Sequence, residues 1–278
     1  MDKKPIEINL SGISRSRAGA KGRMIPRCIL RAMERLIRQD ELNRLLREAF
    51  PAEGSAFASR LLQLQDISLH VKGLEALPHD EKFIFACNHP LGGLDGVAMV
   101  SVLGSHYGDQ NVRVLVNDML MNVTPLAGVF LPVNKYGSQG RRSATLLNEA
   151  LESGKQLVMF PAGLVSRLHD DGAIRDLEWQ KSFVAKAAAT GRRIVPVHFQ
   201  GLNSMRFYRT ARIRKKLHIG FNLEQVLLPA ELCGARGKRF TITFGAPVDI
   251  AAMRADGMPL PEIAGRLRDA CYALGPRS

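Results

Sequence analysis

Short apolar runs alternate with stretches of helical periodicity from about residue 66 to the C-terminus. The runs are rich in β-branched and aromatic residues, and they predict strands over Ile67–Val71, Phe83–Cys87, Val112–Val116, Val129–Val133, Leu157–Phe160, Ile194–Phe199 and Phe240–Phe244. Helices are expected between them, over Asp95–Leu103, Arg141–Ser153, Glu178–Thr190 and Pro261–Ala273. This alternation predicts an α/β domain.

The N-terminal part has a pattern of its own, with apolar residues at helical spacing and arginines every three or four residues. The apolar positions are Ile25, Ile29, Met33, Leu36 and Ile37, and the arginines are Arg27, Arg31, Arg35 and Arg38. We expect a basic amphipathic helix here, and a short second helix from Glu41 to about Glu48. This pattern has two interpretations. In one, the first helix packs on the domain with its arginines in solvent; in the other, it lies in a membrane interface, and the two can be true together.

Composition adds a charge imbalance to this picture. With 278 residues, 46% of them hydrophobic, the chain can bury a core, which excludes overall disorder. Lys and Arg number 39 against 26 Asp and Glu, a net charge of +13. The basic excess is concentrated in residues 11–38 and 191–239. It predicts an anionic partner such as nucleic acid, an anionic membrane surface or an acidic carrier protein.

Several classes of protein are disfavoured. No apolar run reaches the roughly 18 residues that a spanning helix needs, and the first residues lack the apolar stretch of a secretory signal. The four cysteines have no spacing typical of a zinc site or a disulfide framework. We therefore expect a cytoplasmic protein, with an N-terminal basic helical segment over residues 1–60 and one domain over residues 61–278.

The strongest candidate site is the segment ACNHPLGGLDG, residues 86–96, where an apolar run gives way to a helix. Polar groups at the end of a strand lie where open α/β sheets usually place their sites. His89 is a candidate general base, and Asp95 a candidate partner for its far ring nitrogen. A metal site at the same pair is the alternative, although no third ligand stands at a recognisable spacing. The other histidines are expected to be structural.

A second candidate is VMFPAGLVSR, residues 158–167, again a strand that ends in a turn with proline and glycine. Backbone N–H groups of such a turn can stabilise an oxyanion, and Arg167 can hold an anionic headgroup or a carrier phosphate. The alternative is an ordinary turn from a strand into a loop, with no role in a site, which would have much the same sequence.

Together, and in this order, the two segments resemble the lysophospholipid acyltransferase superfamily, which includes the 1-acylglycerol-3-phosphate acyltransferases. Asn88, His89 and Asp95 match its N-H-x4-D block, while Phe160, Pro161, Gly163 and Ser166 or Arg167 match its F-P-E-G-T-R-S block. Residues 128–134 and 195–197 are similar to two further blocks. The resemblance covers roughly residues 65–247.

This resemblance implies a single acyltransferase domain, with a central mixed sheet flanked by helices behind the N-terminal extension. It also implies transfer of a fatty acyl group from a thioester to a lipid hydroxyl, with His89 as base, Asp95 as its partner, and no metal or redox cofactor. The thioester is attacked directly, without an acyl-enzyme. The substrate-binding residues implied are Asn88, Lys135, Arg141, Arg142, Phe160, Pro161, Gly163, Ser166 and Arg167.

The chain departs from the family pattern at three places. Five residues, not four, separate His89 from Asp95, so their contact requires the Gly92-Gly93 pair to absorb one residue. Ala162 and Asn134 replace the family's glutamate and cation. These changes indicate an acceptor other than lysophosphatidic acid, with its carboxylate or phosphate held by the remaining cations, Lys135, Arg141, Arg142 and Arg167.

The variants, together with the segments LVSRL and DLEWQK, resemble the bacterial branch of ornithine- and glycine-lipid O-acyltransferases. We therefore expect a lyso-aminolipid acceptor, and a 1-acylglycerol-3-phosphate acyltransferase is the alternative. The basic residues from Arg206 to Lys216 are candidates to bind acyl carrier protein, which we prefer, the 3′-phosphate of coenzyme A, or membrane lipid. Peripheral contact with the inner face of the cell membrane is expected.

Functions from other classes remain as alternatives. A non-catalytic module that binds a membrane or a carrier protein is disfavoured by the intact Asn88, His89 and Asp95. A nucleic-acid-binding protein is supported by charge alone, because only 6% of residues are aromatic and no binding motif is present. A thioester hydrolase differs only in that water replaces the lipid hydroxyl.

Overall fold

The computed structural model describes residues 5–9, 26–117, 120–133, 137–218, 220 and 223–276. Its centre is a seven-stranded sheet in the order β1-β9-β8-β2-β5-β3-β4. The strands are β1 (Ser68–Lys72), β2 (Phe83–Cys87), β3 (Val112–Val116), β4 (Phe130–Pro132), β5 (Gln156–Met159), β8 (Arg193–Gln200) and β9 (Arg239–Phe244). All seven predicted strands are present, and each strand end lies within one residue of its predicted position.

The sheet is mixed, as predicted. Five neighbouring strands, from β8 to β4, run parallel, whereas β9 is antiparallel to β8 and carries β1 parallel to itself. Strand β2 lies between β5 and β8, and each of its residues is buried. A strand covered on both faces reads as a continuous apolar run, which explains the sequence Phe-Ile-Phe-Ala-Cys.

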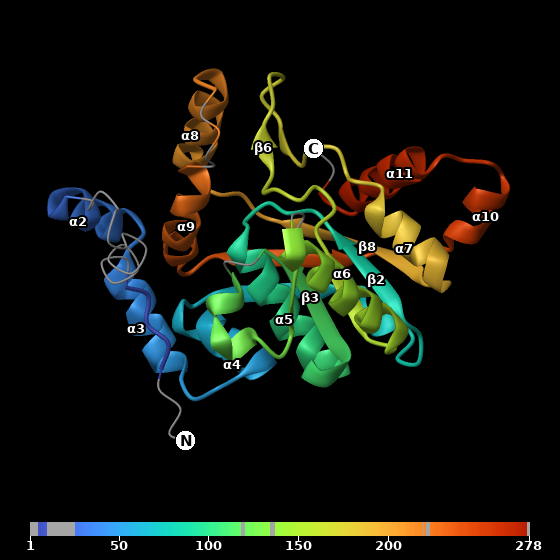
Figure 1. Cartoon of the computed structure of the whole chain (residues 1–278), viewed down its shortest axis with the longest axis horizontal. Coiled ribbons are helices and arrows are strands. Elements are labelled where there is room, and N and C mark those ends of the chain that lie inside the picture. The colour runs from blue at the N-terminus through green and yellow to red at the C-terminus, as the bar shows by residue number, and fades with distance from the viewer. Residues whose placement is uncertain are drawn as a thin grey trace.

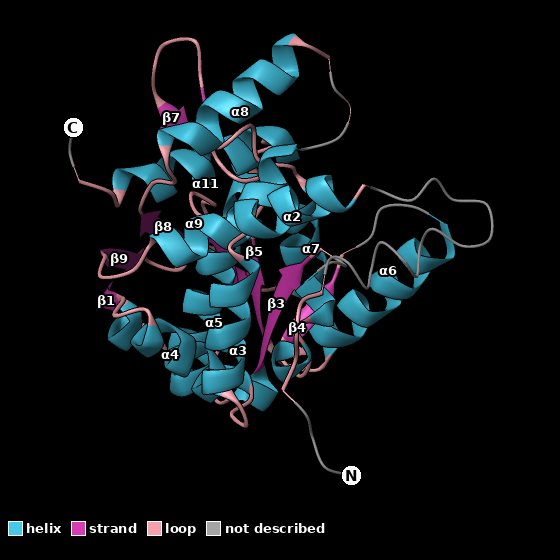
Figure 2. Ribbon diagram, turned by 90° about the vertical axis from the view of Figure 1, so that its left-hand side faces the viewer, coloured by secondary structure: helices cyan, strands magenta, loops and turns pink. Residues whose placement is uncertain are grey.

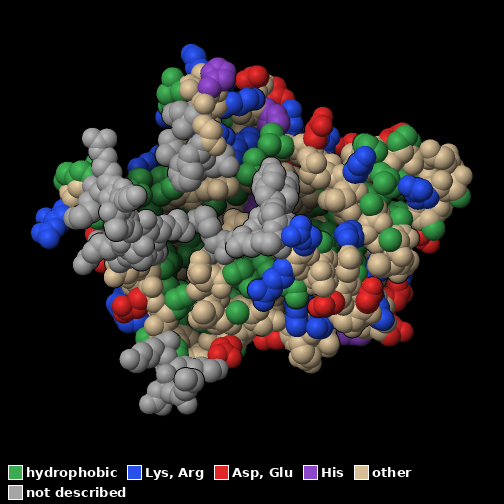
Figure 3. All heavy atoms as spheres, in the orientation of Figure 1, with side chains coloured by type: hydrophobic (Ala, Val, Ile, Leu, Met, Phe, Trp, Pro, Cys, Tyr) green, Lys and Arg blue, Asp and Glu red, His purple; other side chains and the backbone are tan. Residues whose placement is uncertain are grey.

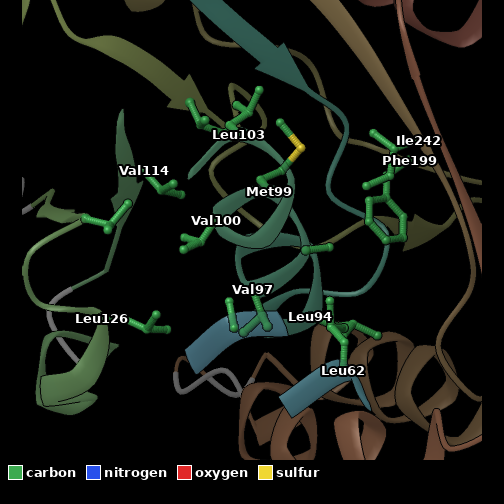
Figure 4. Packing of buried hydrophobic residues seen from close by; sticks show 14 of the residues in the cluster. Leu62, Leu94, Val97, Met99, Val100, Leu103, Val114, Leu126, Phe199 and Ile242 are labelled. Carbon is green, nitrogen blue, oxygen red and sulfur yellow. The ribbon is translucent and has the colours of Figure 1, made fainter. Parts of the chain in front are cut away.

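Helices cover both faces of the sheet (Figures 1 and 2). Successive side chains of a strand point to opposite faces, and Phe83 and Phe85 accordingly join one hydrophobic cluster while Ile84 and Ala86 join the other. The first cluster contains residues of α3 (Gln39–Ala49), α4 (Gly54–Leu64) and α5 (Gly93–Tyr107), and Figure 4 shows α5 packed there. The second contains residues of α6 (Gly137–Glu152), α7 (Ser182–Thr190), α10 (Ile250–Ala255) and α11 (Leu260–Ala273). The predicted fold class is confirmed.

Two helices follow the N-terminal pattern. Helix α2 (Arg27–Leu36) and helix α3 occupy the predicted positions, and α2 contains no buried residue whereas α3 buries a leucine face. The predicted domain boundary at residue 60 lies within α4, and that division stays a prediction. Within the described residues, no helix is both long and apolar enough to cross a bilayer.

Further helices occupy segments for which the apolar pattern gave no prediction. They are α4, α8 (Met205–Lys216), α9 (Leu228–Gly234) and α10. Helix α8 buries only Phe207, Tyr208 and Ala211, so its apolar face is narrow and its basic residues dominate the sequence. Short 3-10 turns and a small hairpin of β6 (Arg167–Leu168) and β7 (Ile174–Arg175) complete the chain.

Candidate active site

The two candidate segments meet because the strands before them are neighbours. Strands β2 and β5 are parallel, with Ala86 beside Met159, so their carboxyl ends lie at the same edge of the sheet. The His89 ring, just beyond β2, lies 4.2 Å from the Phe160 ring, just beyond β5, measured between ring centroids. The sheet thus brings together segments about 70 residues apart in sequence.

His89 faces Asp95 through one ring nitrogen. Nδ1 of His89 lies 2.9 Å from Oδ2 of Asp95, and the carboxylate is fully buried while the imidazole is 18% exposed. A carboxylate beside Nδ1 favours the tautomer with the proton on Nδ1. The other nitrogen, Nε2, is then free of a proton and able to accept one from a hydroxyl.

The start of α5 explains how His89 and Asp95 meet although five residues, and not four, separate them. Asp95 is in the first turn of α5, where Oδ2 accepts hydrogen bonds from the main-chain N–H groups of Leu91, at 2.9 Å, and Gly92, at 3.0 Å. Gly92 precedes the helix with a φ of 75°, a conformation that favours glycine. A Cβ at Gly92 would also lie 2.9 Å from a methyl group of Leu228. The contact expected from the Gly92-Gly93 pair is therefore made, and Gly92 supplies the conformational freedom.

Burial raises the pKa of Asp95 above its ordinary value, and the hydrogen bonds from His89, Leu91 and Gly92 offset this only in part. The ionised carboxylate is therefore held at a cost in stability. In return, a negative charge without bulk water around it interacts strongly with an imidazole that becomes protonated.

Asn88 and Ser166, both predicted to bind substrate, have their polar atoms engaged within the protein. The Asn88 side chain donates to the Phe199 carbonyl at 3.0 Å and accepts from the Phe199 N–H at 2.6 Å, which ties the end of β2 to β8. Ser166 is 2% exposed, and its hydroxyl donates to Oδ1 of Asp176 at 2.6 Å. Substrate binding by these two residues stays a prediction.

Arg167 is likewise engaged by a buried acid. Its guanidinium lies 2.8 Å from Glu224, which is fully buried, and Arg214 of α8 approaches the other oxygen of Glu224 at 2.8 Å. A second nitrogen of Arg167 donates to the carbonyl of Val165 at 2.6 Å. This triad joins the segment after β5 to α8, so the structure gives Arg167 a role that the sequence did not suggest.

The remaining predicted residues belong to the turn after β5, or to α6 and the segment that leads into it. Phe160 and Pro161 form the start of the turn after β5, and Gly163 is exposed with a φ of 68°. Arg141 and Arg142 are exposed on α6, and Lys135 lies outside the described residues. Binding of substrate by these residues stays a prediction.

Asp176 is a site residue to which the sequence reasoning assigned no role. Its carboxylate is 1% exposed, and it lies beside the main chain of His89. The only signal was its place in the segment DLEWQK, where an acid and a tryptophan stand three residues apart.

Comparison with known proteins identifies the family. A family model described as Acyltransferase matches residues 13–275, so the chain belongs to this acyltransferase family. The resemblance found in the sequence is thereby confirmed, as is the class of enzyme.

Two relatives carry the name lyso-glycine lipid O-acyltransferase. The protein of Phocaeicola vulgatus is 43% identical over 241 residues, which cover 87% of this chain and 86% of the relative. The protein of Bacteroides thetaiotaomicron is 42% identical over 241 residues, covering 87% of this chain and 88% of the relative. A crystal structure of the 1-acyl-sn-glycerophosphate acyltransferase PlsC from Thermotoga maritima is similar with a TM-score of 0.49 and 16% identity, over 96% of this chain and 89% of that one.

Proposed function

We propose that this member of the acyltransferase family transfers a fatty acyl group from a thioester to the hydroxyl of lyso-glycine lipid. The observation that carries the proposal is the identity of 42–43%, over most of the chain, with two proteins of that name. The His89–Asp95 pair supports it, because a base beside a buried carboxylate is what deprotonation of a hydroxyl requires.

In the proposed mechanism, Nε2 of His89 removes the proton of the lipid hydroxyl while the oxygen attacks the thioester carbonyl. The imidazolium that forms is stabilised by Asp95 at Nδ1. The tetrahedral oxyanion then collapses, the carbon–sulfur bond breaks, and the departing thiolate takes the proton from His89. An ester and a thiol result, and the enzyme returns to its starting state. The main-chain N–H groups of the turn after Phe160 are the proposed donors to the oxyanion.

The acceptor's carboxylate is the proposed ligand of Arg141 and Arg142, together with Lys135. A guanidinium binds a carboxylate with two parallel hydrogen bonds, which suits the glycine headgroup. Lyso-ornithine lipid carries an additional ammonium group, which these cations would repel. The charge of the proposed subsite therefore favours the glycine lipid.

We further propose that α2 and α8 rest on an anionic membrane. Exposed apolar side chains lie among exposed cations on these helices and on the residues just before and after α8, and we call this the basic apolar surface. Its apolar members are Ile29, Leu202, Met205, Ile213 and Leu217, and its cations are Arg31, Arg35, Arg206, Arg209, Arg212, Lys215 and Lys216. Figure 3 shows blue and green side chains together over α8, at the top of the view.

Apolar groups favour lipid over a carrier protein as the partner of this surface, because they gain free energy only when they leave water. A groove beside the basic apolar surface also supports an orientation in which α2 and α8 face the membrane. It has a volume of about 480 Å³ and is lined by α2, the start of α8, α9 and the residue just before β9, with Arg35, Arg206 and Lys238 among its cations. The acyl donor, either acyl carrier protein or acyl-coenzyme A, then approaches from the water.

The test is a product assay by mass spectrometry. Purified protein and its His89→Ala variant receive lyso-glycine lipid, lyso-ornithine lipid or lysophosphatidic acid, each with palmitoyl carrier protein and with palmitoyl-coenzyme A. We expect diacylated glycine lipid from the wild type and none above background from the variant. Product from lysophosphatidic acid alone would replace the proposed acceptor, and acceptor-independent release of palmitate would indicate a hydrolase.

A further inference from the structure

Among the residues that the structure describes, Asp176 has no lysine or arginine paired with it to account for its burial. The carboxylate is 1% exposed, yet the ion pairs found among the described residues do not include it. A buried charge is expensive unless hydrogen bonds satisfy it. Its location in a loop, next to the reacting histidine, points to a role in the site.

Donors from three separate places surround this carboxylate. Oδ1 accepts from the hydroxyl of Ser166 at 2.6 Å and from the main-chain N–H of His89 at 3.2 Å. Oδ2 accepts from the indole N–H of Trp179 at 3.0 Å. The main-chain N–H of Asp176 in turn donates to the hydroxyl of Tyr272, on α11, at 2.8 Å. The loop that carries Asp176 is therefore fixed at both its side chain and its backbone.

Both peptide groups next to the Cα of His89 are held by this arrangement. Asp176 accepts from the N–H of His89, and the N–H of Ser166 donates to the carbonyl of His89 at 2.8 Å. Since Ser166 also donates its hydroxyl to Asp176, the three residues form a closed network. Fixing both peptide groups sets the backbone angles of His89, and these determine the direction in which its side chain leaves the main chain.

We propose that Asp176 is a positioning residue, which holds the backbone of His89 so that the imidazole meets both Asp95 and the substrate hydroxyl. Two buried carboxylates then divide the work on one histidine. Asp95 orients the ring, and Asp176, 87 residues away in sequence, holds the main chain. The proposal deepens the proposed function and rests on His89 acting as the base.

Three variants test this role. Asp176→Asn keeps the size of the side chain but removes its charge, so the N–H of His89 and the hydroxyl of Ser166 face either a neutral, weaker acceptor or, in the flipped amide, an N–H₂ group. Trp179→Phe is the matched control, because it removes the hydrogen bond to Oδ2, together with part of a buried ring, and leaves Ser166 and His89 in place. Ser166→Ala deletes one donor to Oδ1 and serves as a second probe should Asp176→Asn fail to fold.

We expect Asp176→Asn to lower kcat by about 100-fold, the size of effect that a small misplacement of a catalytic group produces, with KM for donor and acceptor unchanged. Ser166→Ala should lower kcat by about 10-fold, as for one hydrogen bond to a charged group. Trp179→Phe should keep kcat although its Tm falls. A carboxylate that served only the fold would lower kcat in both Asp176→Asn and Trp179→Phe in step with Tm, and that result would overturn the proposal.

Hydrogen–deuterium exchange provides a readout that does not depend on activity. The amide of His89 should exchange faster in Asp176→Asn than in the wild type or Trp179→Phe, because its acceptor is weakened. Unchanged exchange at His89 in Asp176→Asn would also refute the role. Failure of the wild type to acylate any acceptor would refute the proposed function, while the exchange comparison would still decide the role of Asp176.

Discussion

The loop after β2 and the basic apolar surface use their polar side chains in opposite ways. Asn88 in this loop and Asp95, in the helical turn that follows it, are buried and hydrogen-bonded to the protein itself. On the surface, cations such as Arg206 and Lys215 are exposed beside apolar side chains that are about half exposed. The difference shows that catalysis requires side chains held in one geometry. Contact with a fluid membrane requires only charge and exposed apolar area, without fixed partners.

The largest effect is expected at Asp95, which contacts the imidazole of His89. Asp95→Asn should lower kcat by about 10³- to 10⁴-fold, the loss known for a carboxylate-to-amide change beside a catalytic histidine. The neutral amide carries no negative charge to stabilise the imidazolium that forms when His89 takes the proton. Initial rates with the acylated donor and lyso-glycine lipid measure this loss, and a variant within tenfold of wild type would contradict the role of Asp95.

The same substitution should not reduce stability. Because burial raises the pKa of Asp95, the folded state holds the carboxyl proton more tightly than the unfolded chain. This contribution to stability is fully present below the ordinary pKa of 3.8 and is lost as the pH rises through the raised value. At neutral pH the ionised group therefore costs stability, and Asp95→Asn should show an equal or higher Tm in thermal unfolding at pH 7.

An intermediate effect is expected at the triad of Arg167, Glu224 and Arg214, which joins the segment after β5 to α8. Glu224→Gln leaves the mostly buried guanidinium groups of Arg167 and Arg214 without their carboxylate, and the free energy of unfolding should fall by about 3 kcal/mol. Urea unfolding measures the change. The matched control is Glu262→Gln, which breaks an exposed ion pair with Arg266 and should cost at most about 0.5 kcal/mol. Equal losses of unfolding free energy in the two variants would show that the triad does not hold α8 to the segment after β5.

The smallest effect is expected on the basic apolar surface itself. Lys215→Gln combined with Lys216→Gln should weaken binding to vesicles of anionic phospholipid by about 2 kcal/mol, or about 1 kcal/mol for each cation, with Tm unchanged. Flotation or sedimentation with vesicles measures the binding. The control removes two exposed cations on other elements, Arg60→Gln on α4 and Lys72→Gln on β1. Equal weakening in both would mean that net charge, not this surface, attracts the membrane.

The elements with a strong hydrophobic signal were predicted well. The central strands are short apolar runs, and β1 and β9 alternate apolar with polar residues; the first pattern is typical of a strand buried on both faces and the second of a strand buried on one. Helix α7 illustrates the limit, because it begins at Ser182 and not at Glu178 as predicted. The preceding residues are used elsewhere: Trp179 donates to Asp176, and the N–H of Gln180 donates to the carbonyl of Pro161.

The sequence by itself determined the seven main strands, the helices with a clear apolar period, the local charge and the residue types of the two motifs, because periodicity and composition are properties of neighbouring positions. Only the tertiary structure decided which groups meet. It placed β2 beside β5 and so His89 beside Phe160, brought Asp176 to the backbone of His89, and neutralised Arg167 with Glu224. These contacts join positions far apart in the chain. Their formation depends on the order of strands in the sheet and on the burial of charge, which no local pattern encodes.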